Sequence, residues 1–339
     1  MNSGSLDFFV LTGFLGSGKT MLLRDFLHEP EAADTAVIVN EVGEIGLDGM
    51  VLRESGDDLP MAMLSNGCVC CQIGSDLAFT IDRLITGKRP NGAGPLRRII
   101  LETSGLSKPG PVLRTLATLA EHRMRVAVVG TFDLTRGTEI ARFEEAVSQW
   151  AAAHRIVATK TDMVASGEIA DGALAIAAIN PLAEVVATAD RARAVLATFA
   201  PLTAAQPLRE IDLRFSSAHP RVALCLARPV GEVAYPDLAA WLDNLAGALG
   251  ERLLRIKGLV AVAESTHPLL IESVGTMFSP PRPLHVGLPS SFVVIIARDV
   301  ENTELELVSP IGLFQFSSWQ RPAPAWQDDR RAMKAEWVD

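Results

Sequence analysis

The stretch GFLGSGKT (Gly13–Thr20) decides the fold of this chain. It directly follows the apolar run FFVLT and precedes the helical run MLLRDFLHE, and this order of strand, loop and helix is what a phosphate-binding loop (P-loop) requires. Glycines let the backbone curl so that successive N–H groups point at a phosphate, and the helix N-terminus adds partial positive charge. We expect Lys19 to reach the β- and γ-phosphates and Thr20 to place its hydroxyl on Mg²⁺. The backbone cradle comprises Gly13, Phe14, Leu15, Gly16, Ser17 and Gly18.

Short apolar runs alternate with helix-length segments as far as about residue 200. The runs are FFVLT, AVIV, RRIIL, VAVV, RIVA and EVVA. This alternation predicts an α/β fold of the P-loop NTPase type, in which a parallel sheet carries helices on both faces. Ligands of such sheets bind beyond the carboxyl ends of the strands. The motifs described below all fall at such strand ends.

The pattern changes after residue 200, which predicts a second domain. We expect a P-loop domain with a cysteine motif over residues 1–200. A linker is expected over residues 201–212, because PLTAAQPLREID contains two prolines and no sustained hydrophobic periodicity. A smaller α+β domain is predicted over residues 213–300. It would contain strands near Arg221–Ala227, Leu253–Ala263 and Phe292–Ala297 and a helix near Pro236–Leu249. Residues 301–339 are predicted to be a tail, to which we assign no role.

Composition and charge exclude several classes of protein. Hydrophobic residues make up 48% of the chain and charged residues 21%, which is ordinary for a globular protein and excludes extensive disorder. The net charge of -9 and the absence of a clustered Lys/Arg face argue against nucleic-acid binding. The chain shows no basic segment near its start, and no apolar run reaches the roughly 18 residues of a membrane span. We therefore expect a cytoplasmic protein without a membrane partner.

The segment ATKTD bears on the choice of base. Thr159, Lys160 and Asp162 follow the strand RIVA. A carboxylate at this place accepts two hydrogen bonds from the N1–H and the exocyclic amine of guanine, which adenine does not offer in the same geometry. GTP and GDP are therefore favoured over ATP, although Thr159 stands where the guanine motif usually has Asn. The alternative is that Asp162 caps a helix N-terminus.

The run RRIILETSGLSKP is expected to complete the Mg²⁺ site. Its strand ends in Glu102, and an acidic residue at that strand end holds the metal in phosphoryl transfer, commonly through water. Gly105 is expected to sense the γ-phosphate through its N–H. The predicted catalytic set is Lys19, Thr20 and Glu102. A solvent-facing role is the alternative for Glu102.

Three of the four cysteines, Cys68, Cys70 and Cys71, lie within SNGCVCC. Three thiolates so close repel one another, whereas Zn²⁺ or another thiophilic ion deprotonates its sulfur ligands outright. A transition-metal site is therefore the favoured interpretation, and a redox dithiol or chance burial are the alternatives. Cys225 stands alone in VALCLA and is predicted to be a buried strand residue.

The segment VNEVGEIGLD occupies the place of a first GTPase switch, a loop ordered by γ-phosphate and Mg²⁺. It contributes the carboxylates Glu41, Glu44 and Asp48. If one of them completes the metal site, the nucleotide state would open or close that site. The alternative is an acidic surface turn.

With these residues assembled, the chain resembles the CobW-like family of P-loop GTPase metallochaperones. GFLGSGKT, NEVGEIGLD, NGCVCC, ETSGL and TKTD appear in the family's order, and LLRIKGL (Leu253 to Leu259) resembles a signature of its C-terminal domain. The resemblance implies a G domain that loads zinc, cobalt or iron at Cys68, Cys70 and Cys71 when GTP is bound and releases it after hydrolysis. It also implies that Glu44 is a switch carboxylate that joins these cysteines.

The chain departs from the family's pattern at several positions. Val39 stands where some relatives have a further acidic ligand, Met21 replaces a frequent second threonine, and there is no histidine-rich loop. The sequence offers no arginine finger and no water-orienting Gln, so we expect slow hydrolysis that is controlled by metal and partner.

Nucleotide-coupled transfer of Zn²⁺, or alternatively Co²⁺ or Fe²⁺, to a client metalloprotein through the C-terminal domain is the function that the sequence favours. One rival is a regulatory GTPase whose cysteines are structural or redox-active. Others are an activator of a cobalt- or iron-dependent enzyme and a P-loop kinase for a small molecule.

Overall fold

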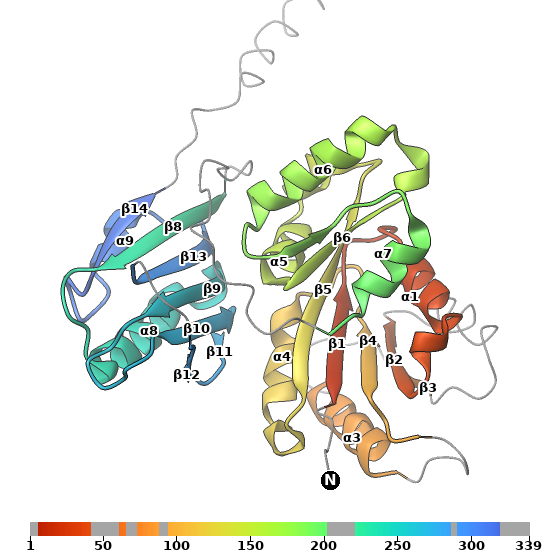
Figure 1. Cartoon of the computed structure of the whole chain (residues 1–339), viewed down its shortest axis with the longest axis horizontal. Coiled ribbons are helices and arrows are strands. Elements are labelled where there is room, and N and C mark those ends of the chain that lie inside the picture. The colour runs from red at the N-terminus through yellow and green to blue at the C-terminus, as the bar shows by residue number, and fades with distance from the viewer. Residues whose placement is uncertain are drawn as a thin grey trace, which may run out of the picture.

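The computed structural model describes residues 6–41, 61–65, 73–87, 94–201, 221–285 and 290–318. Within these residues two sheets lie side by side, each with its own helices (Figure 1). The first is a seven-stranded parallel sheet in the order β3-β2-β4-β1-β5-β6-β7. Its strands are β1 (Asp7–Thr12), β2 (Thr35–Glu41), β3 (Met61–Ser65), β4 (Arg98–Glu102), β5 (Arg125–Asp133), β6 (Arg155–Thr159) and β7 (Glu184–Val186).

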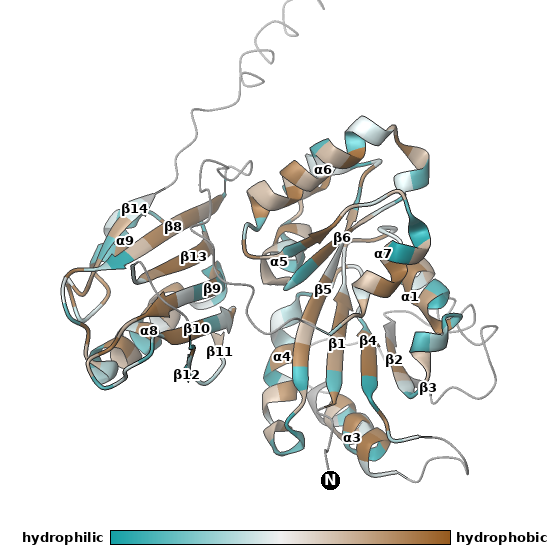
Figure 2. Cartoon of the chain, in the orientation of Figure 1, coloured by the Kyte–Doolittle hydropathy of each residue, from teal (hydrophilic) through white to brown (hydrophobic). Residues whose placement is uncertain are grey.

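Helices cover both faces of the parallel sheet, as the alternation of apolar runs and helical segments predicts. They are α1 (Lys19–Leu27), α3 (Ile73–Thr86), α4 (Pro109–Ala117), α5 (Glu144–Ala152), α6 (Ser166–Ile179) and α7 (Arg191–Thr198). Alternate side chains of a strand point to opposite faces. On β1, Phe8 and Val10 pack in one core with α3, α4, α5 and α6, while Phe9 and Leu11 pack in another with α1 and α7. The strands are accordingly apolar over most of their length, with hydrophilic residues such as Asp7, Arg98 and Arg125 at their starts (Figure 2).

The strand registers bring the carboxyl ends of the strands to one edge of the sheet. On one side of β1, Leu11 pairs with Glu102 of β4. On the other side Thr12 pairs with Gly130 of β5, whose last residue Asp133 pairs with Thr159 of β6. The segments that follow β1, β4, β5 and β6 therefore begin at the same edge.

The second sheet is antiparallel, in the order β11-β10-β9-β13-β8-β14, with β12 paired to β10. Its strands are β8 (Val222–Pro229), β9 (Leu253–Val260), β10 (Leu269–Val274), β11 (Met277–Phe278), β12 (Arg282–Pro283), β13 (Phe292–Arg298) and β14 (Phe314–Ser318). The helices α8 (Tyr235–Leu249) and α9 (Asn302–Glu306) accompany it. A parallel-sheet domain followed by a smaller α+β domain is the predicted fold class, and it is confirmed.

The second sheet is buried on both faces. Cys225 and Ala227 of β8 pack in a core with Trp241 of α8, whereas Leu224 and Leu226 join the core that contains α4 and α5 of the first domain. Because alternate residues of β8 face the two cores, one face of this strand packs against the first domain through apolar contacts.

The second domain extends beyond the residue 300 at which the sequence suggested a tail. β14 pairs with β8, and the ring of Phe314 lies 4.2 Å from that of Trp241, measured between centroids. The alternation of Phe314 and Phe316 with polar residues was obscured by the Pro-, Trp- and charge-rich composition around it. The expected linker at residues 201–212 lies outside the described residues except for Pro201, so that boundary stays a prediction. None of the helices in the described ranges has the length and apolar character needed to cross a bilayer.

Candidate functional site

The P-loop lies between β1 and α1, at the carboxyl edge of the parallel sheet. Gly13 is packed so closely that a Cβ there would lie 1.9 Å from Thr131 Oγ1 and 2.8 Å from Ser17 Oγ, so a larger residue would displace these side chains. Ser17 Oγ and Thr131 Oγ1 share a hydrogen bond of 2.6 Å. The loop therefore rests on β5, and its backbone leads directly into the first turn of α1. This is the context that anion binding by a helix N-terminus requires.

Lys19 is folded over the loop that precedes it. Its side chain is buried, and Nζ donates to the carbonyl oxygen of Gly13 at 2.8 Å and to that of Phe14 at 3.5 Å. The ammonium group is thus held beside the backbone that would cradle a phosphate. A cation in this position complements the negative charge of a di- or triphosphate.

Thr20 and Glu102 come together across the site. Thr20 Oγ1 donates to Glu102 Oε1 at 2.7 Å, and Glu102 is only 3% exposed at the end of β4. The alternative of a solvent-facing Glu102 is therefore wrong. A hydroxyl and a carboxylate are hard oxygen ligands of the kind that Mg²⁺ prefers. The pair fits a Mg²⁺ site chemically.

The loop that follows Glu102 touches the P-loop backbone. A Cβ on Gly105 would lie 2.7 Å from the backbone nitrogen of Leu15, so only glycine fits without moving one of the two loops. Gln149 of α5 is completely buried, and its Nε2 donates to the carbonyl oxygens of Gly105 at 3.0 Å and Ser107 at 2.9 Å. The loop is thus held between the P-loop and α5.

The segment after β6 lies against the P-loop from the other side. Thr159 Oγ1 donates to the carbonyl oxygen of Ser17 at 2.8 Å. Lys160 has a positive φ of 58°, and its Nζ donates to Asp133 Oδ2 at 2.6 Å. Burial alone would raise the pKa of Asp133, but hydrogen bonds from Lys160 and Thr135 outweigh it and the pKa lies below its usual value. Asp133 is therefore a charged anchor for Lys160.

Asp162 lies in a short 3-10 turn, Thr161–Met163, and its side chain is exposed. Lys160 occupies the N-cap position of that turn and Ala165 the N-cap position of α6. The alternative that Asp162 caps a helix is therefore wrong. Its carboxylate stays accessible to a ligand at the carboxyl edge of the sheet.

Several residues of the site were missed by the sequence analysis. Thr131 and Asp133 support the P-loop and Lys160, Gln149 holds the loop after β4, and Arg136 Nη1 donates to the carbonyl oxygen of Leu15 at 3.2 Å. The only signal for Thr131 and Asp133 was their place at the end of the apolar run VAVV. Gln149 and Arg136 carry no sequence signal, because their contacts join residues far apart in the chain.

The proposed metal ligands Cys68, Cys70, Cys71 and Glu44 lie outside the described residues. Within the ranges that the structure describes, no group of three or more His, Cys, Asp or Glu side chains is placed to hold a metal ion.

The strands before these ligands end at the edge that carries the P-loop. β2 ends at Glu41 and β3 at Ser65, and these two residues pair with each other. Val39 of β2 pairs in turn with Glu102.

The fourth cysteine behaves as predicted. Cys225 is 2% exposed on β8, and burial raises the pKa of its thiol to about 11. A thiol in this state is neither a ready nucleophile nor a ready metal ligand.

Comparison with known families identifies the chain. The CobW/HypB/UreG nucleotide-binding domain matches residues 7–187, and the cobalamin synthesis protein CobW C-terminal domain matches residues 222–307. The chain belongs to the CobW/HypB/UreG family. It is a P-loop GTPase of the CobW/YjiA type, so the resemblance drawn from the motifs is confirmed.

Individual relatives match most of the chain. The zinc chaperone YjiA of Escherichia coli (strain K12) is 28% identical, over 87% of this chain and 95% of its own length. The zinc chaperone CobW of Pseudomonas aeruginosa is 30% identical, over 79% of this chain and 80% of its own length. The crystal structure of Zn(II)-bound YjiA GTPase from E. coli superposes with a TM-score of 0.62 at 22% identity, covering 92% of this chain and 99% of that one, which shows the shared fold.

Proposed function

We propose that this GTPase binds Zn²⁺ through Cys68, Cys70 and Cys71, together with Glu44 of the first switch, and transfers it to a client metalloprotein. Co²⁺ and Fe²⁺ are the alternative cargoes. The observation that carries the proposal is the register at the sheet edge, where Glu41 pairs with Ser65 and Val39 pairs with Glu102. The two segments with the metal ligands thus begin beside the strand that ends in a nucleotide-site carboxylate.

Each residue of the nucleotide site has a role in this proposal. Lys19 contacts the β- and γ-phosphates, and the N–H groups of residues 13–18 cradle them. Thr20 and Glu102 hold Mg²⁺, which when bound neutralises charge on the phosphates during hydrolysis. Gly105 senses the γ-phosphate, because its loop already touches Leu15 of the P-loop. Thr159, Lys160 and Asp162 bind the guanine base.

Coupling between nucleotide and cargo follows from adjacency in the sheet. A γ-phosphate orders switch segments, and its loss after hydrolysis releases them. Because β2 lies next to β4, a change at Glu102 acts on the strand that leads to Glu44. A carboxylate that joins or leaves a thiolate site changes both its charge and its number of ligands, and so its affinity for Zn²⁺.

The named relatives support zinc as the cargo and transfer as the outcome. YjiA and CobW are named zinc chaperones, and a crystal structure of YjiA contains Zn(II). A chaperone needs a recipient, and we expect the client to be recognised through the second domain.

The test is competition of the full chain with a chromogenic chelator for Zn²⁺, in the presence of Mg²⁺ with either a non-hydrolysable GTP analogue or GDP. We expect the wild type to hold Zn²⁺ at least ten-fold more tightly with the GTP analogue, a difference of about 1.4 kcal/mol. The variant Cys68→Ser/Cys70→Ser/Cys71→Ser should lose both the tight binding and its dependence on nucleotide. Cys225→Ala is the matched control, because Cys225 is buried in the second domain and should leave both unchanged.

Equal Zn²⁺ affinity in the two nucleotide states would refute the coupling. If the triple variant retained nucleotide-dependent binding of Zn²⁺, the ligands would lie elsewhere. If the wild type bound no Zn²⁺, Co²⁺ or Fe²⁺ above the level of the triple variant, the regulatory GTPase with structural or redox cysteines would replace the proposal.

A further inference from the structure

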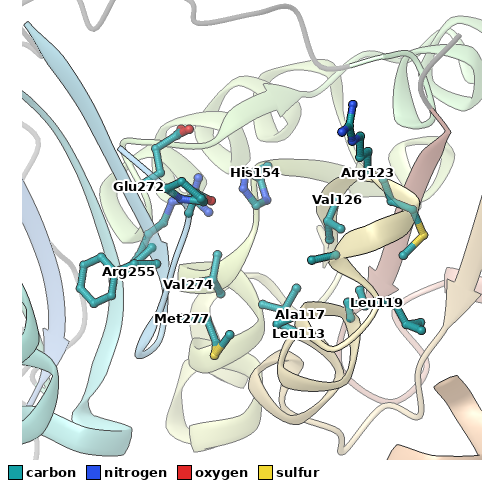
Figure 3. A pocket seen from close by; sticks show the side chains of 17 residues that line it. Leu113, Ala117, Leu119, Arg123, Val126, His154, Arg255, Glu272, Val274 and Met277 are labelled. Carbon is teal, nitrogen blue, oxygen red and sulfur yellow. The ribbon is translucent and has the colours of Figure 1, made fainter. Parts of the chain in front are cut away.

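A cavity of about 340 Å³ lies between the two domains, and none of its lining residues belongs to the nucleotide edge (Figure 3). Ligand pockets in proteins span roughly 300–1,000 Å³, so this volume suits a small molecule. One wall comes from α4 and the residues between α4 and β5, and the other from β10 and β11 of the second domain. Its apolar lining includes Leu113, Ala117, Val126, Val274 and Met277.

Arg255 of β9 supplies a buried cation to the cavity. It is 1% exposed, and its Nη1 donates to the carbonyl oxygens of Ala152 at 2.8 Å and Ala153 at 3.0 Å. Its Nε has no hydrogen-bond partner among the described residues. Burial lowers the pKa of this guanidinium to about 10, which leaves it charged at neutral pH. The cavity wall thus contains a desolvated positive charge.

His154, which follows Ala153 in the chain, adds a neutral donor beside the Arg255 guanidinium (Figure 3). Its Nδ1 accepts the backbone N–H of Val128 at 3.0 Å, so the neutral ring carries its proton on Nε2. Burial first, and then the charges of Arg255, Lys257 and Arg155, hold the pKa of His154 well below its usual value. The ring therefore stays neutral at pH 7 and presents an N–H group in a positive field.

Ser273 and Glu272 are further polar residues of the lining, as are Arg123 and Ser279. Ser273 is 3% exposed, and its hydroxyl has no partner within the described ranges. The Glu272 carboxylate is already balanced by Lys257 Nζ at 3.4 Å and Arg282 Nη2 at 3.8 Å. Beside this carboxylate, whose charge also acts on Arg255, the lining offers three donors: Arg255 Nε–H, His154 Nε2–H and the Ser273 hydroxyl.

We propose that this interdomain cavity binds a compact amphipathic carboxylate. Its carboxylate accepts hydrogen bonds from Arg255, His154 and Ser273, which offsets the cost of burying a guanidinium with an unpaired donor. Its hydrocarbon body packs against Leu113 and Met277. This inference is independent of the proposed metal transfer, because no residue of the cavity belongs to the nucleotide edge or to the cysteine motif.

The probe is octanoate, titrated calorimetrically into the full chain with GDP and Mg²⁺ present so that the nucleotide edge is occupied. Octan-1-ol is the neutral comparison. Hydrogen bonds to a charged group contribute about 1.5–3 kcal/mol against about 0.5–1.5 for neutral ones, so octanoate should bind at least about five-fold more tightly.

Two variants locate the binding site. Ala117→Trp, at an exposed position of the lining, should fill the cavity and abolish binding. Ser273→Ala should weaken it about three- to ten-fold, the effect of one neutral donor. Thr118→Trp is the matched control, because Thr118 is the next residue but does not line the cavity.

The proposal is overturned if octanoate does not bind, if octan-1-ol binds equally well, or if Ala117→Trp and Thr118→Trp have the same effect. Thermal melts of each variant reveal misfolding. If Ala117→Trp misfolds, the Ser273→Ala variant is the test, and an octanoate affinity equal to that of the wild type overturns the proposal.

Discussion

Replacing Glu102 by Gln tests the nucleotide site most directly. The substitution keeps the shape of the side chain and removes its charge at a position that is 3% exposed. Glu102 Oε1 accepts the hydroxyl of Thr20 at 2.7 Å, so the change acts on both predicted Mg²⁺ residues at once. The loop after Glu102 carries Gly105, the proposed γ-phosphate sensor, and reaches Leu15 of the P-loop.

The expected loss of Mg²⁺ affinity follows from the hydrogen bond between Thr20 and Glu102. A hydrogen bond to a charged group contributes about 1.5–3 kcal/mol and one to a neutral group about 0.5–1.5, so the amide loses about 1–1.5 kcal/mol at Thr20 alone. Loss of a residue that orients metal ligands typically lowers metal affinity about 10- to 100-fold. We therefore expect the Mg²⁺ concentration for half-maximal GTP hydrolysis to rise at least ten-fold. The apo protein should not be destabilised, because a buried carboxylate carries a desolvation cost that the amide avoids.

The assay is phosphate release at saturating GTP over a series of Mg²⁺ concentrations, with thermal melts of the apo protein beside it. Glu121→Gln is the matched control, since that side chain is 74% exposed and lies outside the site. An unchanged Mg²⁺ midpoint in Glu102→Gln would refute the assignment of Glu102. A large fall in the apo melting temperature would show instead that the carboxylate is structural.

Three further predictions concern base choice, the domain contact and the second core. Asp162→Ala should weaken GDP binding about 10- to 100-fold while leaving ADP binding unchanged, measured by competition with a fluorescent nucleotide, and a kinase-like site would show no such difference. Glu144 accepts hydrogen bonds from Lys108 and from Arg298 of the second domain, and these two bonds lower its pKa. The contribution of the Glu144 carboxylate to the free energy of unfolding is therefore fully present above its unfolded pKa of about 4.3, and it is lost as the pH falls through the lower folded pKa. Glu144→Gln should lower the free energy of unfolding in urea by about 0.5–1 kcal/mol at pH 7 and by almost nothing at pH 2.5. A cost that does not change with pH would contradict this. Trp241→Ala should destabilise the second domain by about 3–5 kcal/mol, because Trp241 is buried against Phe314, and a loss below about 1 kcal/mol would mean that this core repacks.

Much of the first domain could be predicted from local sequence. The six apolar runs quoted from the first domain all form strands, because a strand buried between two layers of helices must be apolar throughout and short. In the second domain β10 and β14 were missed, and β14 pairs with β8 although α8, β9, β10 and β13 separate the two strands in the chain.

The sequence by itself determined the P-loop, the order of the motifs and the family, because the phosphate loop, the TKTD segment and the cysteine cluster are each built from consecutive or near-consecutive residues. Only the tertiary structure decided which side chains support them. Gln149 holds the loop of Gly105, and Thr131 supports Ser17, across separations that no local pattern encodes. The same holds for the cavity that contains His154 and Arg255, since its shape and its unpaired donors arise only when the second sheet packs against α4 and α5 of the first domain.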